Sequence, residues 1–345
     1  MEIKISTLRV IECGPLKDVI IDFNDSEKNR PQSVTILAGA NGSGKTTTLE
    51  LIFSLLDLFK FSPEANSDFI NNLNIVHILK QTEYAELRLI IDNEICIVFW
   101  GEIEHNDKIK NIHGIQRYFD EEGNKKWKIY SKGHIPKKIN AFVNNLEKTP
   151  LDFPFYPYNE PKNYQIPTIL YFPYNRELLN VKGDQVYREQ GNYYFNYRYQ
   201  INRTFKGSFE SYLIWLDYSD QELFHIVIQF LNHLNFGGKK FNIRRKDLSV
   251  IVTTKDQSQH ELSALSSGEQ SLLIMLLEIR RRIIPGSIVI IDEIENSLHP
   301  EFQYLIAKSL MNLQKEIQFQ LLLTTHQHEF VKIFGRKNAR ILTEF

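Results

Sequence analysis

Residues 39–46 read Gly-Ala-Asn-Gly-Ser-Gly-Lys-Thr, which fits the pattern GxxxxGK[ST] at every fixed position. Glycines in such a loop let successive backbone N–H groups turn toward a single anion. Lys45 supplies a positive charge for the β- and γ-phosphates of a nucleotide, and the hydroxyl of Thr46 is suited to ligate Mg²⁺. The stretch therefore predicts a phosphate-binding loop.

The flanking sequence predicts the strand, loop and helix order that this loop needs. Ser33–Leu37 reads as a buried strand, and apolar spacing predicts a helix from Lys45 to about Lys60. The positive end of that helix dipole points at the same anion. The residues that we expect to bind the nucleotide here are Gly39, Asn41, Gly42, Ser43, Gly44, Lys45, Thr46 and Thr47.

A second candidate site follows an apolar run near the end of the sequence. Ser287–Ile291 predicts a buried strand, and Asp292 and Glu293 come directly after it. Ligands of parallel sheets sit at the carboxyl ends of the strands. Asp292 is therefore placed to hold Mg²⁺ through its water shell, and Glu293 to polarise an attacking water. The alternative is a strand that simply ends in two solvated acids.

Residues 265–270 read LSSGEQ and open a helix predicted over Leu265–Arg282. Serine hydroxyls, backbone N–H groups and a helix dipole together favour an anion. An ordinary serine N-cap explains one of the serines but not the whole string. We expect nucleotide contacts from Ser266, Ser267, Gly268 and Glu269.

The rest of the pattern indicates a largely parallel α/β sheet, because helices and apolar strands alternate near the end of the sequence. The expected elements there are Pro300–Gln314 (helix), Phe319–Thr325 (strand) and Glu329–Phe334 (helix). Earlier strands are expected at Lys4–Glu12, Val19–Asn24, Tyr84–Ile91, Ile95–Trp100, Thr168–Phe172 and Leu248–Thr254. Helical spacing runs through Glu210–Leu234.

Taken together, GANGSGKTT, LSSGEQ, IVIIDE, ENSLHP and LLLTTHQHEF resemble the ABC-type ATPase heads. More narrowly the chain is similar to the RecF/SMC/OLD-like branch, which includes AAA-type ATPase subunits of bacterial anti-phage defence systems. The resemblance covers about residues 1–60 and 260–345. It implies an α/β head with a mainly parallel P-loop sheet, an N-terminal antiparallel β layer, and a mixed α/β insertion between Walker A and the signature motif.

The same resemblance divides the chain and assigns roles to its residues. An N-terminal lobe is expected over 1–60, an insertion or lid region over 61–260, and a C-terminal lobe over 261–345. ATP and Mg²⁺ are the implied cofactors, with Thr46 and Asp292 at the metal. Lys45, Glu293 and His326 are the implied catalytic residues, and His326 contacts the γ-phosphate in cis.

Such heads pair around two ATP molecules, so the resemblance implies a homodimer or a higher even oligomer. The signature residues Ser266, Ser267 and Gly268 would then act on the ATP of the partner, and Asn296 and Ser297 would couple the two sites.

The lid loop of the family carries a glutamine, but here TILYF is followed by Asn175 and Arg176. Arg176 is either a sensor of nucleotide or partner, or a solvated loop residue, and the adenine contact is left unassigned.

The bulk composition limits the compartment and the partners. A formal charge of −1 gives no whole-molecule argument for binding nucleic acid or an acidic membrane. Two isolated cysteines, Cys13 and Cys96, form neither a disulfide framework nor a zinc site, which favours a reducing compartment. Since no apolar run reaches about 18 residues and the first residues lack a leader pattern, we expect a cytoplasmic protein with no membrane partner.

Two functions of different class stay open. In the first, the head is a sensor or scaffold that regulates a separately encoded effector, a nuclease or toxin. In the second, it is a DNA-repair clamp, for which the basic clusters are Lys125–Lys128, Lys137-Lys138, Lys239-Lys240 and Arg244–Lys246. A transporter cassette fits poorly, because the interval from Lys45 to Gly268 is too long. The sequence after His326 is too short for a Toprim nuclease domain, so we expect none.

Overall fold

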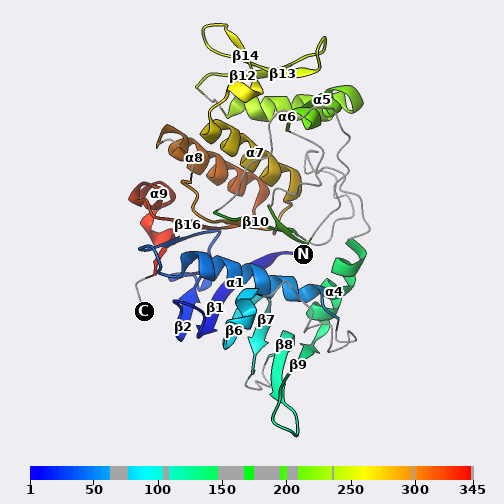
Figure 1. Cartoon of the computed structure of the whole chain (residues 1–345), viewed down its shortest axis with the longest axis vertical. Coiled ribbons are helices and arrows are strands. Elements are labelled where there is room, and N and C mark those ends of the chain that lie inside the picture. Colours follow the sequence, from blue (N-terminus) through cyan, green and yellow to red (C-terminus); the bar gives the residue numbers. More distant parts are fainter. Residues whose placement is uncertain are drawn as a thin grey trace.

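The computed structural model describes residues 1–62, 77–103, 109–146, 167–174, 195–199, 209–234, 237–296, 298 and 300–342. These residues form stacked layers (Figure 1). Helix α1 (Lys45–Asp57) lies between a parallel and an antiparallel sheet, and helices α7 (Ser267–Arg282) and α8 (Pro300–Ile317) cover the other face of the parallel sheet.

The central sheet is parallel throughout and has the strand order β11-β10-β15-β16-β5-β17. Its strands are β5 (Val34–Ala38), β10 (Ile169–Phe172), β11 (Asn196–Arg198), β15 (Ile288–Ile291), β16 (Gln320–Thr325) and β17 (Ala339–Ile341). All residues of β10, β15 and β16 are buried, as expected of strands that are covered on both faces. The strands predicted from these apolar runs are confirmed to within a residue or two.

The antiparallel layer packs on the other side of α1 and has the strand order β2-β1-β6-β7-β8-β9. Its strands are β1 (Ile3–Ile11), β2 (Val19–Asp22), β6 (Tyr84–Ile91), β7 (Glu94–Gly101), β8 (Asn111–Phe119) and β9 (Lys125–Lys132). Neighbouring strands are antiparallel except β7 and β8, which are parallel. The turn between β6 and β7 places Asp92 and Asn93 at φ of 47° and 70°, which suits a two-residue hairpin.

Smaller elements complete these two layers. They are the strands β3 (Asn24–Asp25) and β4 (Arg30–Pro31), the helices α3 (His77–Lys80), α4 (His134–Leu146) and α9 (His328–Phe334), and the 3₁₀ turns Leu58–Lys60, Leu262–Ala264 and Arg336–Asn338. The helix expected to reach Lys60 therefore ends at Asp57 and tightens into a 3₁₀ turn. Among the described residues no helix is long and apolar enough to cross a membrane.

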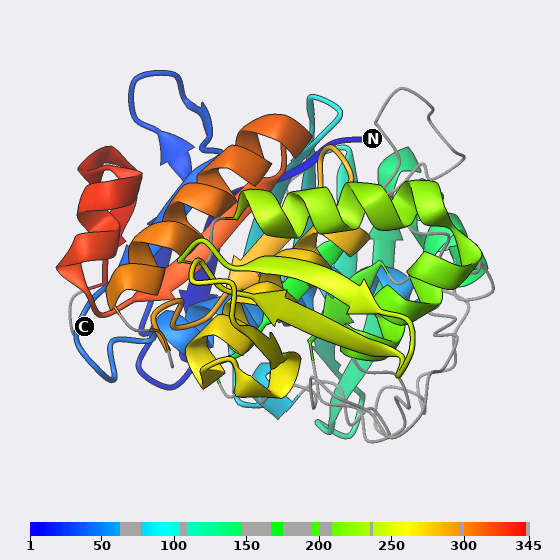
Figure 2. The ribbon, with the colours of Figure 1, turned by 90° about the horizontal axis from the view of Figure 1, so that it is seen from above.

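A further unit lies on the side of α7 and α8 that faces away from the parallel sheet, and it is seen from above in Figure 2. It consists of α5 (Phe209–Ser219), α6 (Gln221–His233), and an antiparallel sheet of β12 (Lys240–Arg244), β13 (Ser249–Thr253) and β14 (Gln259–Glu261). The sequence showed helical spacing through Glu210–Leu234, and the structure forms two helices there. Asp220 ends the first helix and caps the second, since its carboxylate accepts a hydrogen bond from the Leu223 N–H at 3.0 Å.

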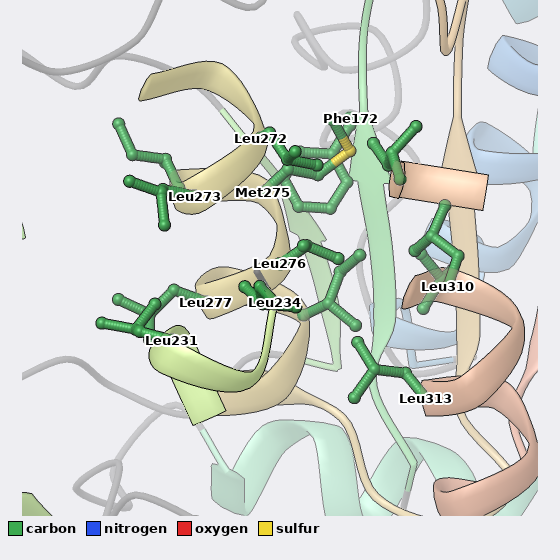
Figure 3. Packing of buried hydrophobic residues seen from close by; sticks show 14 of the residues in the cluster. Phe172, Leu231, Leu234, Leu272, Leu273, Met275, Leu276, Leu277, Leu310 and Leu313 are labelled. Carbon is green, nitrogen blue, oxygen red and sulfur yellow. The ribbon is translucent and has the colours of Figure 1, made fainter. Parts of the chain in front are cut away.

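The two faces of the parallel sheet belong to two separate hydrophobic cores. One face packs against α1 and the antiparallel layer, and the other packs against α5 to α8. Leucines of α7, α8 and α6 interdigitate with Phe172 of β10 in the second core (Figure 3). The parallel sheet is therefore held from both sides, and its strand ends are fixed relative to one another. The mainly parallel sheet, antiparallel layer and mixed insertion expected from the sequence are all present.

Gln320 joins the two sheets through buried polar contacts. Its side-chain amide donates to the carbonyl oxygens of Ile5 and Gln32 at 3.0 and 3.1 Å, and its Oε1 accepts from the Ile5 N–H at 2.7 Å. Gln320 is 1% exposed, so these backbone groups have no access to bulk water. The amide thus fixes β1 against β16.

We predict that Gln320→Leu lowers the free energy of unfolding by about 3 kcal/mol, because it leaves buried backbone groups without hydrogen bonds. Chemical denaturation measures the change. Thr168→Val is the matched control, since the buried Thr168 hydroxyl has no hydrogen-bond partner among the described residues. Equal stability of Gln320→Leu and wild type would show that the amide does not join the sheets.

Candidate functional site

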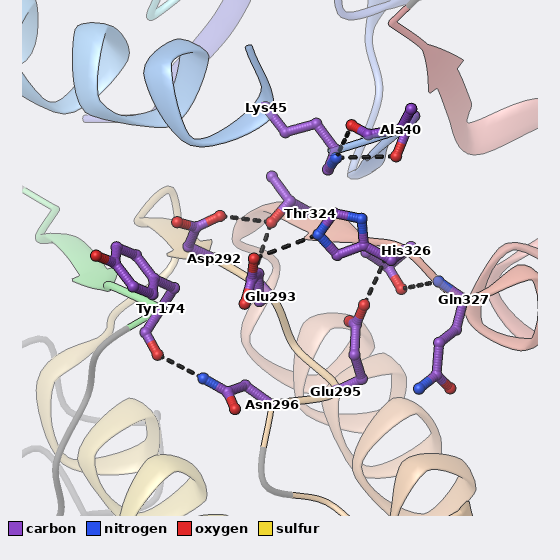
Figure 4. A network of polar contacts seen from close by, with 12 residues as sticks. Ala40, Lys45, Tyr174, Asp292, Glu293, Glu295, Asn296, Thr324, His326 and Gln327 are labelled. Atoms are coloured by element: carbon purple, nitrogen blue, oxygen red, sulfur yellow. Dashed lines mark hydrogen bonds and ion pairs between the residues drawn. The ribbon is translucent and has the colours of Figure 1, made fainter. Parts of the chain in front are cut away.

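The register of three neighbouring strands brings the predicted site residues to one edge of the sheet. Ile36 of β5, Leu323 of β16 and Ile291 of β15 lie level with one another. The strands are parallel, so the segments that follow them leave the sheet on the same side. These segments are the phosphate-binding loop, the acids Asp292 and Glu293, and His326 (Figure 4).

Lys45 is held inside the loop by two carbonyl groups. Its Nζ donates to Gly39 O at 2.9 Å and to Ala40 O at 2.7 Å, and the residue is 5% exposed. Burial lowers the pKa of Lys45 from its ordinary value, and the negative charges of Glu293, Asp292 and Glu295 act in the opposite direction. The lysine thus lies within electrostatic reach of acids from another strand.

Two glycines of the loop occupy positions that exclude any side chain. A Cβ atom on Gly39 would lie 2.4 Å from the carbonyl oxygen of Leu342. Gly44 has φ of +87°, and a Cβ atom there would lie 2.6 Å from Cδ2 of Leu16. These close contacts fix the path of the loop between the C-terminal strand and the N-terminal β layer.

The loop residues differ in how far they are exposed. Ser43 is buried, Asn41 and Gly42 are exposed, and Thr46 and Thr47 at the start of α1 are half-buried. The Ser43 hydroxyl has no hydrogen-bond partner among the described residues. A buried hydroxyl of this kind favours an additional polar group at the loop.

The two acids after β15 are held by one residue of β16. The Thr324 hydroxyl donates to Asp292 Oδ1 at 2.6 Å and accepts from the Glu293 N–H at 2.7 Å. Asp292 is fully buried, whereas Glu293 is half-buried and has φ of +46°. This left-handed conformation is uncommon for a residue with a side chain. The two neighbouring carboxylates therefore differ in environment, Asp292 being enclosed and Glu293 partly exposed to solvent.

His326 contacts the segment after β15 through both its ring and its backbone. Its Nε2 lies 3.3 Å from Glu293 Oε1, and its backbone N–H donates to Glu295 Oε1 at 2.5 Å. Asn296 extends the same segment, since its Nδ2 donates to Tyr174 O at 2.7 Å. Glu295 and Thr324 lie in the motifs ENSLHP and LLLTTHQHEF, but the sequence predicted no role for either side chain.

The signature residues form the first turn of α7. Ser266 is the N-cap, its Oγ accepts from the Glu269 N–H at 3.3 Å, and its N–H donates to Glu269 Oε2 at 3.0 Å. The other carboxylate oxygen of Glu269 pairs with Lys239 at 2.5 Å. Ser266 and Ser267 are exposed, while Gly268 and Glu269 are buried. Ser266 and Ser267 are thus exposed at a helix start that is fixed by a capping box.

The described residues do not link the signature to the loop of the same chain by any hydrogen bond or ion pair. Asn175, Arg176 and Ser297 lie outside the described residues. A cavity of about 660 Å³ adjoins the loop at Gly39 and Ala40, and its other walls carry His326, His328 and Arg336. This cavity leaves space beside the loop for a group larger than a phosphate.

Comparisons with known proteins agree with this arrangement. A family described as "AAA domain, putative AbiEii toxin, Type IV TA system" matches residues 181–332, which include the signature, both acids and His326. The chain is 24% identical over 382 residues to the Retron Vc95 probable ATPase of Vibrio cholerae serotype O1 biovar El Tor, covering 93% of this chain and 71% of that protein. The motifs and these relatives support a P-loop ATPase of the ABC type.

Other similarities are shorter or structural. The Retron Ec83 probable ATPase of Escherichia coli is 32% identical over 117 residues, covering 31% of this chain and 21% of that protein. Among solved structures, the SMC head domain from Thermotoga maritima aligns over 96% of this chain and 92% of its own, with 16% identity and a TM-score of 0.45. A dimeric bacterial ABC transporter cassette aligns over 99% and 94%, with 14% identity and a TM-score of 0.37. Because both scores are below 0.5, the assignment depends on the motifs and the sequence relatives.

Lys239 has a structural role beside the signature residues. Burial opposes the charged form of Glu269, but hydrogen bonds from Lys239 and Ser266 outweigh it, so the pKa of Glu269 lies below its ordinary value of 4.5. An acid with a depressed pKa stabilises the folded state above that ordinary value, and the stabilisation is lost as the pH falls through the folded pKa.

We therefore predict that Lys239→Met lowers stability by about 1–3 kcal/mol at pH 7, and that the loss shrinks as the pH falls through the folded pKa of Glu269, which lies below 4.5. Unfolding curves at several pH values measure this. Lys240→Met removes an exposed charge at the next position and is the control. A deficit in Lys239→Met that does not change with pH would contradict the role assigned to the pair.

Proposed function

We propose that the chain binds ATP with Mg²⁺ at the edge of its parallel sheet and hydrolyses it when two heads pair. The observation that carries the proposal is the convergence of Lys45, Asp292, Glu293 and His326 on one strand edge. The partnerless buried hydroxyl of Ser43 supports a bound phosphate at the loop.

When bound, Mg²⁺ would neutralise negative charge on the β- and γ-phosphate oxygens. Thr46 and Asp292 are the residues that we propose to hold it, the first through its hydroxyl and the second through its carboxylate. The donor set fits a hard cation, since both side chains offer oxygen. Lys45 binds the same phosphates as a cation, and the N–H groups of residues 39–47 bind them through the positive end of α1.

Glu293 is the proposed base, because it is half-buried at the strand edge and close to His326. It orients a water molecule and polarises its O–H bond for attack on the γ-phosphate. The His326 ring, 3.3 Å from Glu293, is placed to hold the Glu293 carboxylate and to donate toward the γ-phosphate. The two side chains thus act as a pair.

We further propose that two heads form a homodimer, or a higher even oligomer, around two ATP molecules. Support comes from the exposed serines Ser266 and Ser267 at the start of α7, which have no bond to the loop of their own chain among the described residues. The helix end offers N–H groups and a dipole to the γ-phosphate of the partner.

For biological role, we propose a sensor or scaffold that regulates a separately encoded effector, a nuclease or toxin, in bacterial anti-phage defence. This role is supported by the sequence relatives, which are retron probable ATPases and a family described as a putative AbiEii toxin. A cytoplasmic location remains part of the proposal. Co-expression with neighbouring gene products tests it: an ATP-dependent complex is expected, and a head that captures no product in either nucleotide state would contradict it.

A DNA clamp is the second candidate, and the structure favours one part of the surface for it. Arg244 and Arg245 are already paired with Asp247 and Asp217. Lys126 and Lys128 lie exposed on strand β9, where Lys126 is 3.9 Å from Asp120 and Lys128 lies over the exposed ring of Tyr118. Strong duplex binding that weakens with salt, and that Lys126→Glu with Lys128→Glu abolishes, would place the clamp ahead of the scaffold.

We predict that Glu293→Gln reduces the rate of ATP hydrolysis by at least about a hundredfold and leaves ATP affinity within about threefold, because the base is lost and the phosphate contacts are kept. Phosphate release and equilibrium binding measure the two quantities. Glu121→Gln, in an exposed turn, is the control. Unchanged turnover in Glu293→Gln would exclude Glu293 as the base.

We predict that Ser267→Arg abolishes ATP-dependent pairing while the monomer binds ATP normally, because the arginine side chain blocks the partner's phosphate. Light scattering with and without Mg·ATP measures the mass. Ser263→Arg introduces the same side chain at an exposed position just before the signature. A loss of ATP affinity in the Ser267→Arg monomer would instead place the signature on its own ATP.

A further inference from the structure

The Thr324 hydroxyl makes two hydrogen bonds of opposite sense at the centre of the site (Figure 4). It donates its proton to Asp292 Oδ1 at 2.6 Å, and its oxygen accepts the Glu293 N–H at 2.7 Å. Among the twenty side chains only a hydroxyl or a protonated acid both donates and accepts through one oxygen. Thr324 therefore joins the two neighbouring acids through a single atom.

The hydrogen bonds of the Thr324 hydroxyl lie in a buried part of the site, so losing them is costly. Thr324 and Asp292 are both 0% exposed, so bulk water does not replace a lost hydrogen bond. The Glu293 backbone is left-handed at φ of +46°, a conformation that persists only where its surroundings enforce it. Two hydrogen bonds hold the Glu293 backbone: its N–H donates to the Thr324 hydroxyl, and its carbonyl oxygen accepts the Asn296 N–H at 2.9 Å.

The same residue also links the acids to His326. The Thr324 carbonyl oxygen accepts the Ile294 N–H at 3.2 Å, and the backbone N–H of His326 donates to Glu295 Oε1 at 2.5 Å. Residues 292–295 and 324–326 are thus connected by successive hydrogen bonds. A shift of one segment is transmitted to the other.

We propose that Thr324 is a positioning residue for ATP hydrolysis, which aims the Glu293 carboxylate at the attacking water and fixes the Asp292 carboxylate for the metal. The inference deepens the proposed function and rests on it. Thr324 contacts neither the water nor the phosphate, and it acts only through the two acids. Its loss therefore affects the rate of the chemical step more than the affinity for ATP.

Three variants separate this role from a merely structural one. Thr324→Val keeps the shape and removes the hydroxyl, while Thr324→Ser keeps the hydroxyl. Thr35→Val is the matched control, because Thr35 lies on the adjacent strand β5, is 0% exposed, and has a hydroxyl with no hydrogen-bond partner among the described residues. Each variant is measured for ATP affinity, single-turnover hydrolysis, and hydrogen exchange of the peptide that contains residues 292–296.

Thr324→Val is expected to slow hydrolysis by at least about tenfold, to change ATP affinity by less than about threefold, and to speed exchange in 292–296. Thr324→Ser should restore the rate and the protection, and Thr35→Val should match wild type. The proposal is overturned if Thr324→Val hydrolyses ATP at the wild-type rate, or if Thr35→Val loses as much.

Failure of the proposed function gives a different result. If wild type binds ATP without hydrolysing it, the proposal of ATPase activity fails. The hydrogen-exchange measurement still tests whether Thr324 holds residues 292–296 in place. Unchanged exchange at 292–296 in Thr324→Val would then reject the positioning of the acids as well.

Discussion

The parallel pairing of β5, β16 and β15 is the constraint on which the site depends. Ile36, Leu323 and Ile291 share one level across these strands, so the next residues of each strand emerge together. A shift of one residue in either pairing would turn the side chains of the shifted strand to the other face of the sheet and separate Thr324 from Asp292. The register is held because both faces of the sheet are covered by hydrophobic cores.

The surrounding layers stabilise the site through different contacts. Gln320 fixes β16 to β1 of the antiparallel layer, and the Leu16 side chain closes on Gly44 at the start of α1. On the other face, Lys239 connects the segment after α6 to the capped end of α7. The phosphate-binding loop and the signature are therefore each supported by a part of the chain that lies far away in sequence.

Sequence reasoning found the elements whose signals are local. The loop at 39–46, the strand before Asp292 and the serine cap at Ser266 each follow from a short pattern, and the structure contains all three. It missed the break at Asp220, because apolar spacing continues through the two helices. Thr324 lies in an apolar strand, and its bonds to Asp292 and Glu293 arise only from the pairing of β15 with β16, which no local pattern encodes.

The most direct test of the account is calorimetric titration of Mg·ATP into wild type and into Lys45→Ala, with circular dichroism to verify that both are folded. Lys45 is the loop's buried cation, so removing it takes away the charge that we propose to bind the phosphates. The account predicts one ATP per chain in wild type and an affinity at least about a hundredfold weaker in the variant. Equal affinity in the two proteins, or no binding by wild type, would contradict the claim that this edge of the sheet is an ATP site.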